Sequence, residues 1–221
     1  MTVWNIHFLN ARNGLTPIMD QIRATARQVL AQVSEQAALP RFDLVIKGKA
    51  GGGIPEWGIG GHAPAPGLIE VTLNPERFDP ALLRRTLVHE MHHLIRWDGP
   101  GYGRSLGEAL VSEGLAGHFV LQVLGGKPDP WDATVPASGA PRRAMNEWSR
   151  LDYDHAEWFF GKGGLRKWTG YGLGHRLVGD YLAQNAGSNA ADLATVAADQ
   201  FRSTMRHLAG SDPSEDAPAT D

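Results

Sequence analysis

The segment from Thr86 to Trp97, TLVHEMHHLIRW, carries three histidines and a glutamate among leucines that predict a buried helix. Asp79 is the expected N-cap of this helix, Pro80 lies in its first turn, and the sequence DGPG at 98–101 ends it. Polar side chains lose hydration on a buried helix and need partners that offset the loss. The chain must therefore fold so that a charged or polar group faces this segment.

The spacing His89-Glu90-x-x-His93 places the two outer histidines four residues apart, so that they lie nearly above one another on one helix face. Two imidazoles on one face can share a metal ion, and zinc takes nitrogen ligands in a tetrahedral arrangement. Glu90 lies about 100° around the helix from His89, where it can reach a water on the metal without ligating it. The motif predicts a zinc site with Glu90 as the general base. His92 occupies a variable position and is expected to point behind the metal or toward solvent.

A catalytic zinc usually has three protein ligands and a water, so the sequence must supply one more ligand. The nearby candidates are Glu108, Glu113 and His118. Glu108 is expected to form a capping box with Ser105, and His118 lies late in its helix, which leaves Glu113 as the favoured ligand. Glu113 lies in the middle of the apolar helix ALVSEGLAGHF, where a carboxylate needs a partner. Each histidine taken alone would be read as an ordinary core residue.

The composition limits the other classes of function. Of the 221 residues, 42% are hydrophobic and 20% are charged, which is typical of a soluble globular protein. The net charge of −3 gives no basic field for nucleic acid or an anionic membrane, so neither is an expected partner. The chain has no cysteine, so a metal must be bound by His, Asp or Glu. No basic leader and no long apolar run are present, and a cytoplasmic location is expected.

The hydrophobic pattern predicts an α+β fold, with a small mixed sheet in the first third and a mostly helical remainder. Strands are expected at 3–9, 42–46 and 68–73, with a possible further strand in the glycine-rich stretch between the last two. Helices are expected at 16–38, at the metal motif, from Ser105 to Gly125, and at 142–151, 172–183 and 190–208. We expect a single domain over residues 1–209 and a disordered acidic tail at 210–221.

The spacing His89-Glu90-x-x-His93, followed after nineteen residues by Glu113, resembles that of the gluzincin class of zinc metallopeptidases, to which thermolysin belongs. The words RRTLVHEMHHLIR, LVSEGLAGHF and GYGLGHRLVGDYL resemble a little-characterised family of predicted zinc-dependent proteases, over roughly residues 60–182. The metzincin pattern fits worse, because Arg96 and Gly99 stand where it needs glycine and histidine. A thermolysin-like chain has an acidic residue four positions after the glutamate ligand, where this chain has Gly117.

The resemblance implies a zincin-like fold and zinc-dependent hydrolysis of peptide bonds, in which a metal-bound water activated by Glu90 attacks the carbonyl. It also implies a later residue that donates a hydrogen bond to the oxyanion, for which Tyr171 is the first choice and His175 the second. Plain helix packing is the alternative for both. The peptide or protein substrate is expected to pair with the strand at 68–73.

Two other readings compete with a peptidase. A catalytically silent zincin scaffold could act as a metal- or peptide-binding module, although the intact Glu90 argues against this. A structural zinc would need a fourth protein ligand, and no unassigned residue clearly offers one. The oligomeric state is left open.

Overall fold

The computed structural model describes residues 2–211, and these form two compact units. Of the described residues, unit 1 comprises those up to Gly101 with Val123–Gly125, and unit 2 comprises Tyr102–Gln122 and those from Gly126 onward. A single domain can consist of two such units, so the expected domain over 1–209 stays a prediction. Of the expected tail at 210–221, Gly210 ends a helix, and the part from 212 onward lies outside the described residues.

Unit 1 contains a four-stranded mixed sheet, which agrees with the predicted α+β class. Its strands are β1 (Trp4–Leu9), β2 (Phe42–Gly48), β3 (Ile59–Ala65) and β4 (Leu68–Leu73), in the order β1-β2-β4-β3. The pairs β1-β2 and β2-β4 are parallel, and β3 runs antiparallel to β4. The strand within the glycine-rich stretch is therefore real, and it forms an edge of the sheet.

This order corrects one expectation from the sequence. The strand at Leu68–Leu73 was expected to receive the substrate as an edge strand, but β4 lies inside the sheet between β2 and β3. The apolar alternation that identified β4 reports which face of a strand is buried, and it carries no information about strand order. The edge strand beside β4 is β3.

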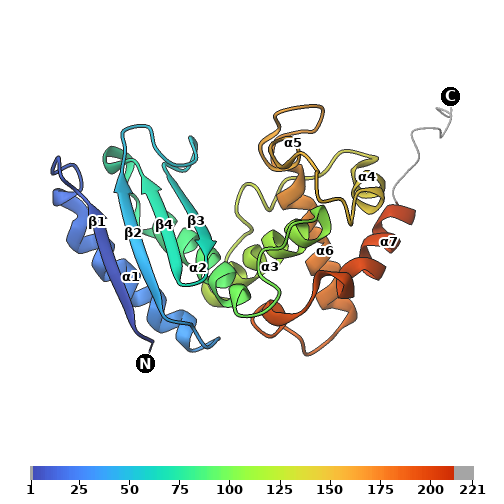
Figure 1. Cartoon of the computed structure of the whole chain (residues 1–221), viewed down its shortest axis with the longest axis horizontal. Coiled ribbons are helices and arrows are strands. Elements are labelled where there is room, and N and C mark those ends of the chain that lie inside the picture. Colours follow the sequence, from blue (N-terminus) through green and yellow to red (C-terminus); the bar gives the residue numbers. More distant parts are fainter. Residues whose placement is uncertain (1, 212–221) are drawn as a thin grey trace. The chain divides into compact units, whose positions relative to one another are not determined.

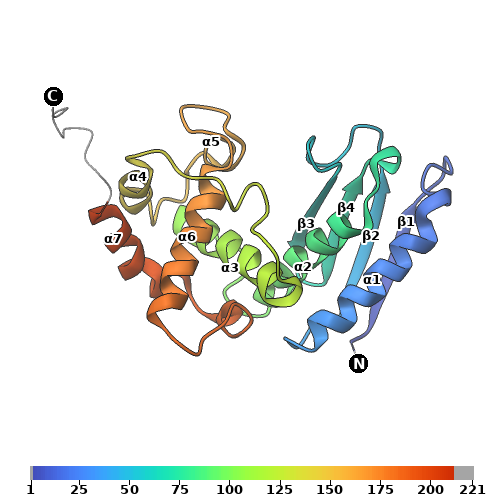
Figure 2. The same ribbon diagram turned by 180° about the vertical axis from the view of Figure 1, so that it is seen from behind.

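Two helices, α1 (Met19–Ser34) and α2 (Pro80–Trp97), cover the same face of the sheet (Figures 1 and 2). A short 3₁₀ turn, Thr16–Ile18, leads into α1. Alternate residues of β2 and β4 point into this layer and are fully buried, as for the register partners Leu44 and Ile69. The burial of these alternate side chains fixes the register of the sheet.

Unit 2 is helical. Its helices are α3 (Leu106–Leu124), α4 (Ala140–Asn146), α5 (His155–Phe160), α6 (Thr169–Gln184) and α7 (Arg202–Gly210), with 3₁₀ turns at Asp192–Thr195 and Ala198–Phe201. The helices α3 and α6 meet at Gly114 and Gly174, where a Cβ on either residue would overlap the backbone of the other helix. Only glycine permits so close a crossing.

Two expected helices in this unit are wrong in extent, and α5 was not expected. The helix expected at 142–151 ends at Asn146, because the carbonyls of Trp148 and Arg150 accept hydrogen bonds from the first amides of α3, at 2.9 and 3.2 Å. The helix expected at 190–208 is interrupted by extended backbone at Val196 and Ala197.

None of the helices in the described part of the chain is long and apolar enough to cross a membrane.

Candidate metal centre

Helix α2 presents His89 and His93 as a converging pair. The Asp79 side chain accepts a hydrogen bond from the Ala81 amide at 2.7 Å, which caps the helix as the sequence predicted. The Nε2 atoms of His89 and His93 lie 3.1 Å apart, and the two side chains are only 8% and 6% exposed. Their rings meet edge to face, with centroids 4.8 Å apart. The Nε2 atoms of the two rings therefore point into one small buried volume.

The distance between these nitrogens fits a shared metal ion. Two nitrogens that ligate one tetrahedral zinc at roughly 2.0–2.1 Å lie about 3.3 Å from each other. The observed 3.1 Å is close to that separation. A rigid helix holds the pair in this arrangement, so little ordering would be required on binding. His92 is fully buried, which rules out the solvent-facing alternative for it.

Glu90 lies against the edge strand of the sheet. A Cβ on Gly61 of β3 would lie only 2.5 Å from Oε1 of Glu90, so the carboxylate occupies the space above this glycine. Two tryptophan indoles hold α2 in this position. Trp97 donates to the Ala63 carbonyl at 3.0 Å, and Trp57 donates to the Thr86 hydroxyl at 3.3 Å. The conformation of Glu90 is therefore coupled to the backbone of β3.

In unit 2, Glu113 lies in the middle of α3, is 6% exposed, and accepts a hydrogen bond from the Tyr102 hydroxyl at 2.7 Å. Burial and, next, the charge of Glu113 raise the pKa of Tyr102 well above its ordinary value. Tyr102 therefore keeps its proton and acts as the donor. No sequence pattern marks Tyr102, although it lies in the short turn between the two predicted helices.

The other two candidate ligands have different roles. Glu108 forms the predicted capping box, because its Oε2 accepts from the Ser105 amide at 2.8 Å and its own amide contacts the Ser105 hydroxyl at 3.3 Å. His118 stacks on His175 with ring centroids 4.0 Å apart, and its Nε2 contacts the His175 carbonyl at 2.9 Å. His89, His93 and Glu113 are each buried and of a metal-ligating type.

Gly117, where a thermolysin-like chain has an acidic residue, lies against the carboxylate of Asp132. A Cβ on Gly117 would lie 2.6 Å from Oδ2 of Asp132, which is 4% exposed. Gly117 follows Glu113 by one helical turn, so both belong to the same face of α3. Asp132 therefore places a buried carboxylate next to position 117, where a thermolysin-like chain has an acidic residue.

The two residues expected to stabilise an oxyanion have different surroundings. The Tyr171 ring packs between Phe159 and Trp131, with centroids at 5.0 and 6.5 Å, and its charge is among those that raise the pKa of Tyr102. His175 stacks on His118, and burial lowers its pKa to about 4. Among the described residues its Nδ1 has no hydrogen-bond partner.

A second group of side chains near Glu113 was missed. The Tyr153 hydroxyl and Nδ1 of His155 lie 3.0 Å apart, and the rings of His155 and Tyr102 have centroids 6.5 Å apart. A histidine and two tyrosines within the short segment YDHAEWFF and the turn before α3 were the available signal, but neither segment matched a known motif.

The comparisons with known proteins bear on this arrangement. The chain is 25% identical over 146 residues to a protein of Bacillus subtilis (strain 168) called "Uncharacterized protein YjfC", a match that covers 58% of this chain. The chain spans about half of that relative, 49% of its length. A family profile described as "Predicted Zn-dependent protease (DUF2268)" matches residues 22–203, a range that includes α2 and α3. The chain therefore belongs to this family of predicted zinc-dependent proteases.

Proposed function

We propose that this protein is a zinc metallopeptidase of the gluzincin type, with a zincin-like fold, that hydrolyses peptide bonds. The observation that carries the proposal is the pair of buried Nε2 atoms, of His89 and His93, 3.1 Å apart on either side of Glu90 in the sequence. The family description agrees with a zinc-dependent protease. The cytoplasmic location stays a prediction.

Glu113 is the proposed third ligand. The nineteen-residue spacing from His93 supports it, and so does elimination within α3. Glu108 is engaged in the capping box, and His118 is stacked on His175. Oε1 of the Glu113 carboxylate accepts the hydrogen bond from the Tyr102 hydroxyl. A buried carboxylate loses hydration, and a cation beside it offsets part of that cost.

A zinc ion held by these residues would supply a Lewis acid and a water of lowered pKa. Glu90 accepts the proton of the attacking water, and its packing on Gly61 limits the orientations that its carboxylate can adopt. Tyr171 is the proposed donor to the carbonyl oxygen, supported by its place beside Phe159 in the cluster that contains Tyr102. His175 remains a weaker candidate, because its ring is stacked on His118.

The proposed binding surface for the peptide is the edge strand β3. An extended peptide can add to a sheet edge through backbone hydrogen bonds. β3 is the edge strand whose backbone contacts Glu90, so a peptide paired with it would pass close to the general base. This replaces the interior strand β4 as the expected partner of the substrate.

The test compares the wild-type protein with Glu90→Gln after both are loaded with zinc. The wild type should contain one zinc per chain and cleave members of a peptide library, whereas Glu90→Gln should bind zinc equally and lose almost all turnover. Equal inactivity of both proteins, at full zinc content, would instead favour a catalytically silent scaffold that binds metal or peptide.

A further inference from the structure

Glu113 belongs to a cluster of aromatic and histidine side chains within unit 2. The Tyr102 hydroxyl contacts Glu113 at 2.7 Å, and the Tyr102 ring is a neighbour of His155, with centroids 6.5 Å apart. Among charged groups, Glu113 has the largest effect on the pKa values of both Tyr153 and His155. Tyr102 is therefore a neighbour of both Glu113 and His155, and His155 in turn contacts Tyr153.

The His155 ring is held from three directions. It stacks on Phe159 with centroids 4.5 Å apart and planes 20° apart, and it meets the edge of Phe160 at 5.5 Å. The Tyr153 hydroxyl contacts Nδ1 at 3.0 Å. Stacking fixes the plane of an imidazole ring, and a hydrogen bond to one nitrogen fixes the direction in which each ring nitrogen faces.

The protonation states of the two partners determine which nitrogen carries the proton. Burial raises the pKa of Tyr153 to about 12, so the phenol keeps its proton at neutral pH. Burial lowers the pKa of His155, so its imidazole is neutral there. We assign Tyr153 as the donor to Nδ1, and the imidazole proton then resides on Nε2. Within the part of the chain that the structure describes, Nε2 of His155 has no hydrogen-bond partner.

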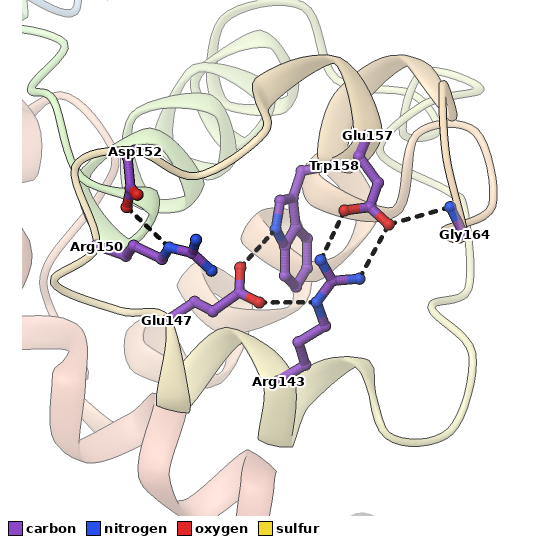
Figure 3. A network of polar contacts seen from close by, with 7 residues as sticks. All are labelled: Arg143, Glu147, Arg150, Asp152, Glu157, Trp158 and Gly164. Atoms are coloured by element: carbon purple, nitrogen blue, oxygen red, sulfur yellow. Dashed lines mark hydrogen bonds and ion pairs between the residues drawn. The ribbon is translucent and has the colours of Figure 1, made fainter.

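The helix that carries His155 is anchored by an ion-pair network (Figure 3). Arg143 of α4 binds the Glu157 carboxylate through both terminal nitrogens, at 3.1 and 2.6 Å, and its Nε binds Glu147 at 2.9 Å. Trp158 donates to the other oxygen of Glu147 at 3.2 Å, and the Gly164 amide donates to Glu157 at 3.0 Å. These contacts tie α5 to α4 and to the following loop.

We propose that His155 is a second catalytic hydrogen-bond donor of the peptidase, whose Nε2–H contacts the substrate carbonyl oxygen as negative charge develops on it, and that Tyr153 positions it. This assignment rests on the proposed peptidase function. Phe159 packs against both His155 and Tyr171, so the same ring restrains both side chains. Donors fixed before the reaction stabilise a developing charge without a cost of reorganisation.

The test uses zinc-loaded full-length protein and three variants: His155→Leu, His155→Gln and Tyr153→Phe. His155→Leu should lower kcat by about 10²- to 10³-fold with KM and zinc content nearly unchanged. His155→Gln, which keeps an N–H donor, should recover part of that loss. Long-range proton–nitrogen NMR should show His155 as the Nε2–H tautomer in the wild type and a mixture of tautomers in Tyr153→Phe.

Two outcomes overturn the assignment without touching the peptidase proposal. One is an active wild type together with a His155→Leu variant that keeps its kcat at full zinc content. The other is read from binding of a phosphinic peptide, which mimics the tetrahedral intermediate. The dissociation constant of the phosphinic peptide should rise in His155→Leu by the same factor as kcat falls. Equal affinity of the wild type and His155→Leu for this peptide overturns the assignment, even if the wild type turns over no substrate. Wild-type protein that has full zinc and neither cleaves peptides nor binds the phosphinic peptide overturns both proposals.

Discussion

The carboxylate of Glu90 lies directly over Gly61 of the edge strand β3, so close that a Cβ on residue 61 would be 2.5 Å from Oε1. The proposed general base and the proposed peptide-binding strand are therefore in contact. Real Cβ atoms are not found at such a distance from an oxygen, so a side chain at this position must displace Glu90 or the strand. Glu90 can hold this position only because residue 61 is a glycine and has no Cβ.

Gly61→Ala should lower kcat strongly while zinc content stays complete. The added methyl group forces the Glu90 carboxylate from its position, and a displacement of about 1 Å in a catalytic group can cost roughly 10²-fold in rate. The measurement is kcat on a cleaved peptide together with elemental analysis of zinc.

Gly60→Ala is the matched control, because a Cβ there would lie 3.4 Å from its nearest neighbour, the Cα of Gly53, and away from Glu90. Its turnover should stay near that of the wild type. Equal turnover in both variants would show that Glu90 tolerates the methyl group at residue 61.

The pair of glutamates on α3 was separable from sequence, because each carries a local signal. Glu108 follows Ser105 by three residues, which is the spacing of a capping box, and the structure confirms this role. Glu113 lies in an apolar stretch without such a pattern. The periodicity of a helix also placed His89 and His93 on one face, and their Nε2 atoms do converge.

Glu113→Gln should lower zinc affinity by more than about 100-fold, since loss of even an outer partner of a ligand costs roughly 10- to 100-fold. Glu108→Ala should leave zinc affinity unchanged and lower the free energy of unfolding by about 1 kcal/mol through loss of the cap. Competition with a chelator of known affinity measures the first quantity, and denaturant unfolding measures the second. The reverse pattern, with zinc lost in Glu108→Ala alone, would contradict the choice of Glu113.

Features that depend on strand order or on several distant segments were beyond the sequence. The alternation in Leu68–Leu73 showed a strand but not its interior place beside β3. Tyr102, Tyr153 and His155 come from a turn and from the residues around the start of α5, and their approach to Glu113 is a product of tertiary packing. These residues share no regular spacing in the sequence, so the sequence pattern does not predict that they meet.

Acid should destabilise the protein partly through His175. The pKa of this imidazole is about 4 in the folded protein, below its ordinary value of 6.5, because burial and then His118 disfavour the charged form. The unfolded chain therefore binds the extra proton first, and the free energy of unfolding falls as the pH drops from 6.5 toward 4. The expected loss is on the order of 1 to 3 kcal/mol, allowing for partial solvent screening.

Denaturant unfolding of His175→Gln at several pH values measures this effect. The variant should lose less stability than the wild type between pH 6.5 and 4. His207→Gln, which changes an exposed histidine of α7, should follow the wild-type curve and serves as the control. Parallel curves for His175→Gln and the wild type would show that His175 takes up its proton over the same pH range in the folded protein as in the unfolded chain.

Arg143 should contribute to stability through geometry more than through charge. Its guanidinium binds Glu157 through two nitrogens and Glu147 through a third, an arrangement that a lysine cannot reproduce. Arg143→Lys should therefore lower the free energy of unfolding by about 1 kcal/mol, a value kept small because the side chain is 38% exposed. The guanidinium of Arg150, also drawn in Figure 3, contacts the exposed Asp152 through Nε at 2.8 Å, so Arg150→Lys should leave the midpoint of thermal unfolding unchanged. Because Arg143 also ties α5 to α4, its replacement should broaden the NMR resonance of His155, and an unchanged resonance would show that α5 keeps its position without this network.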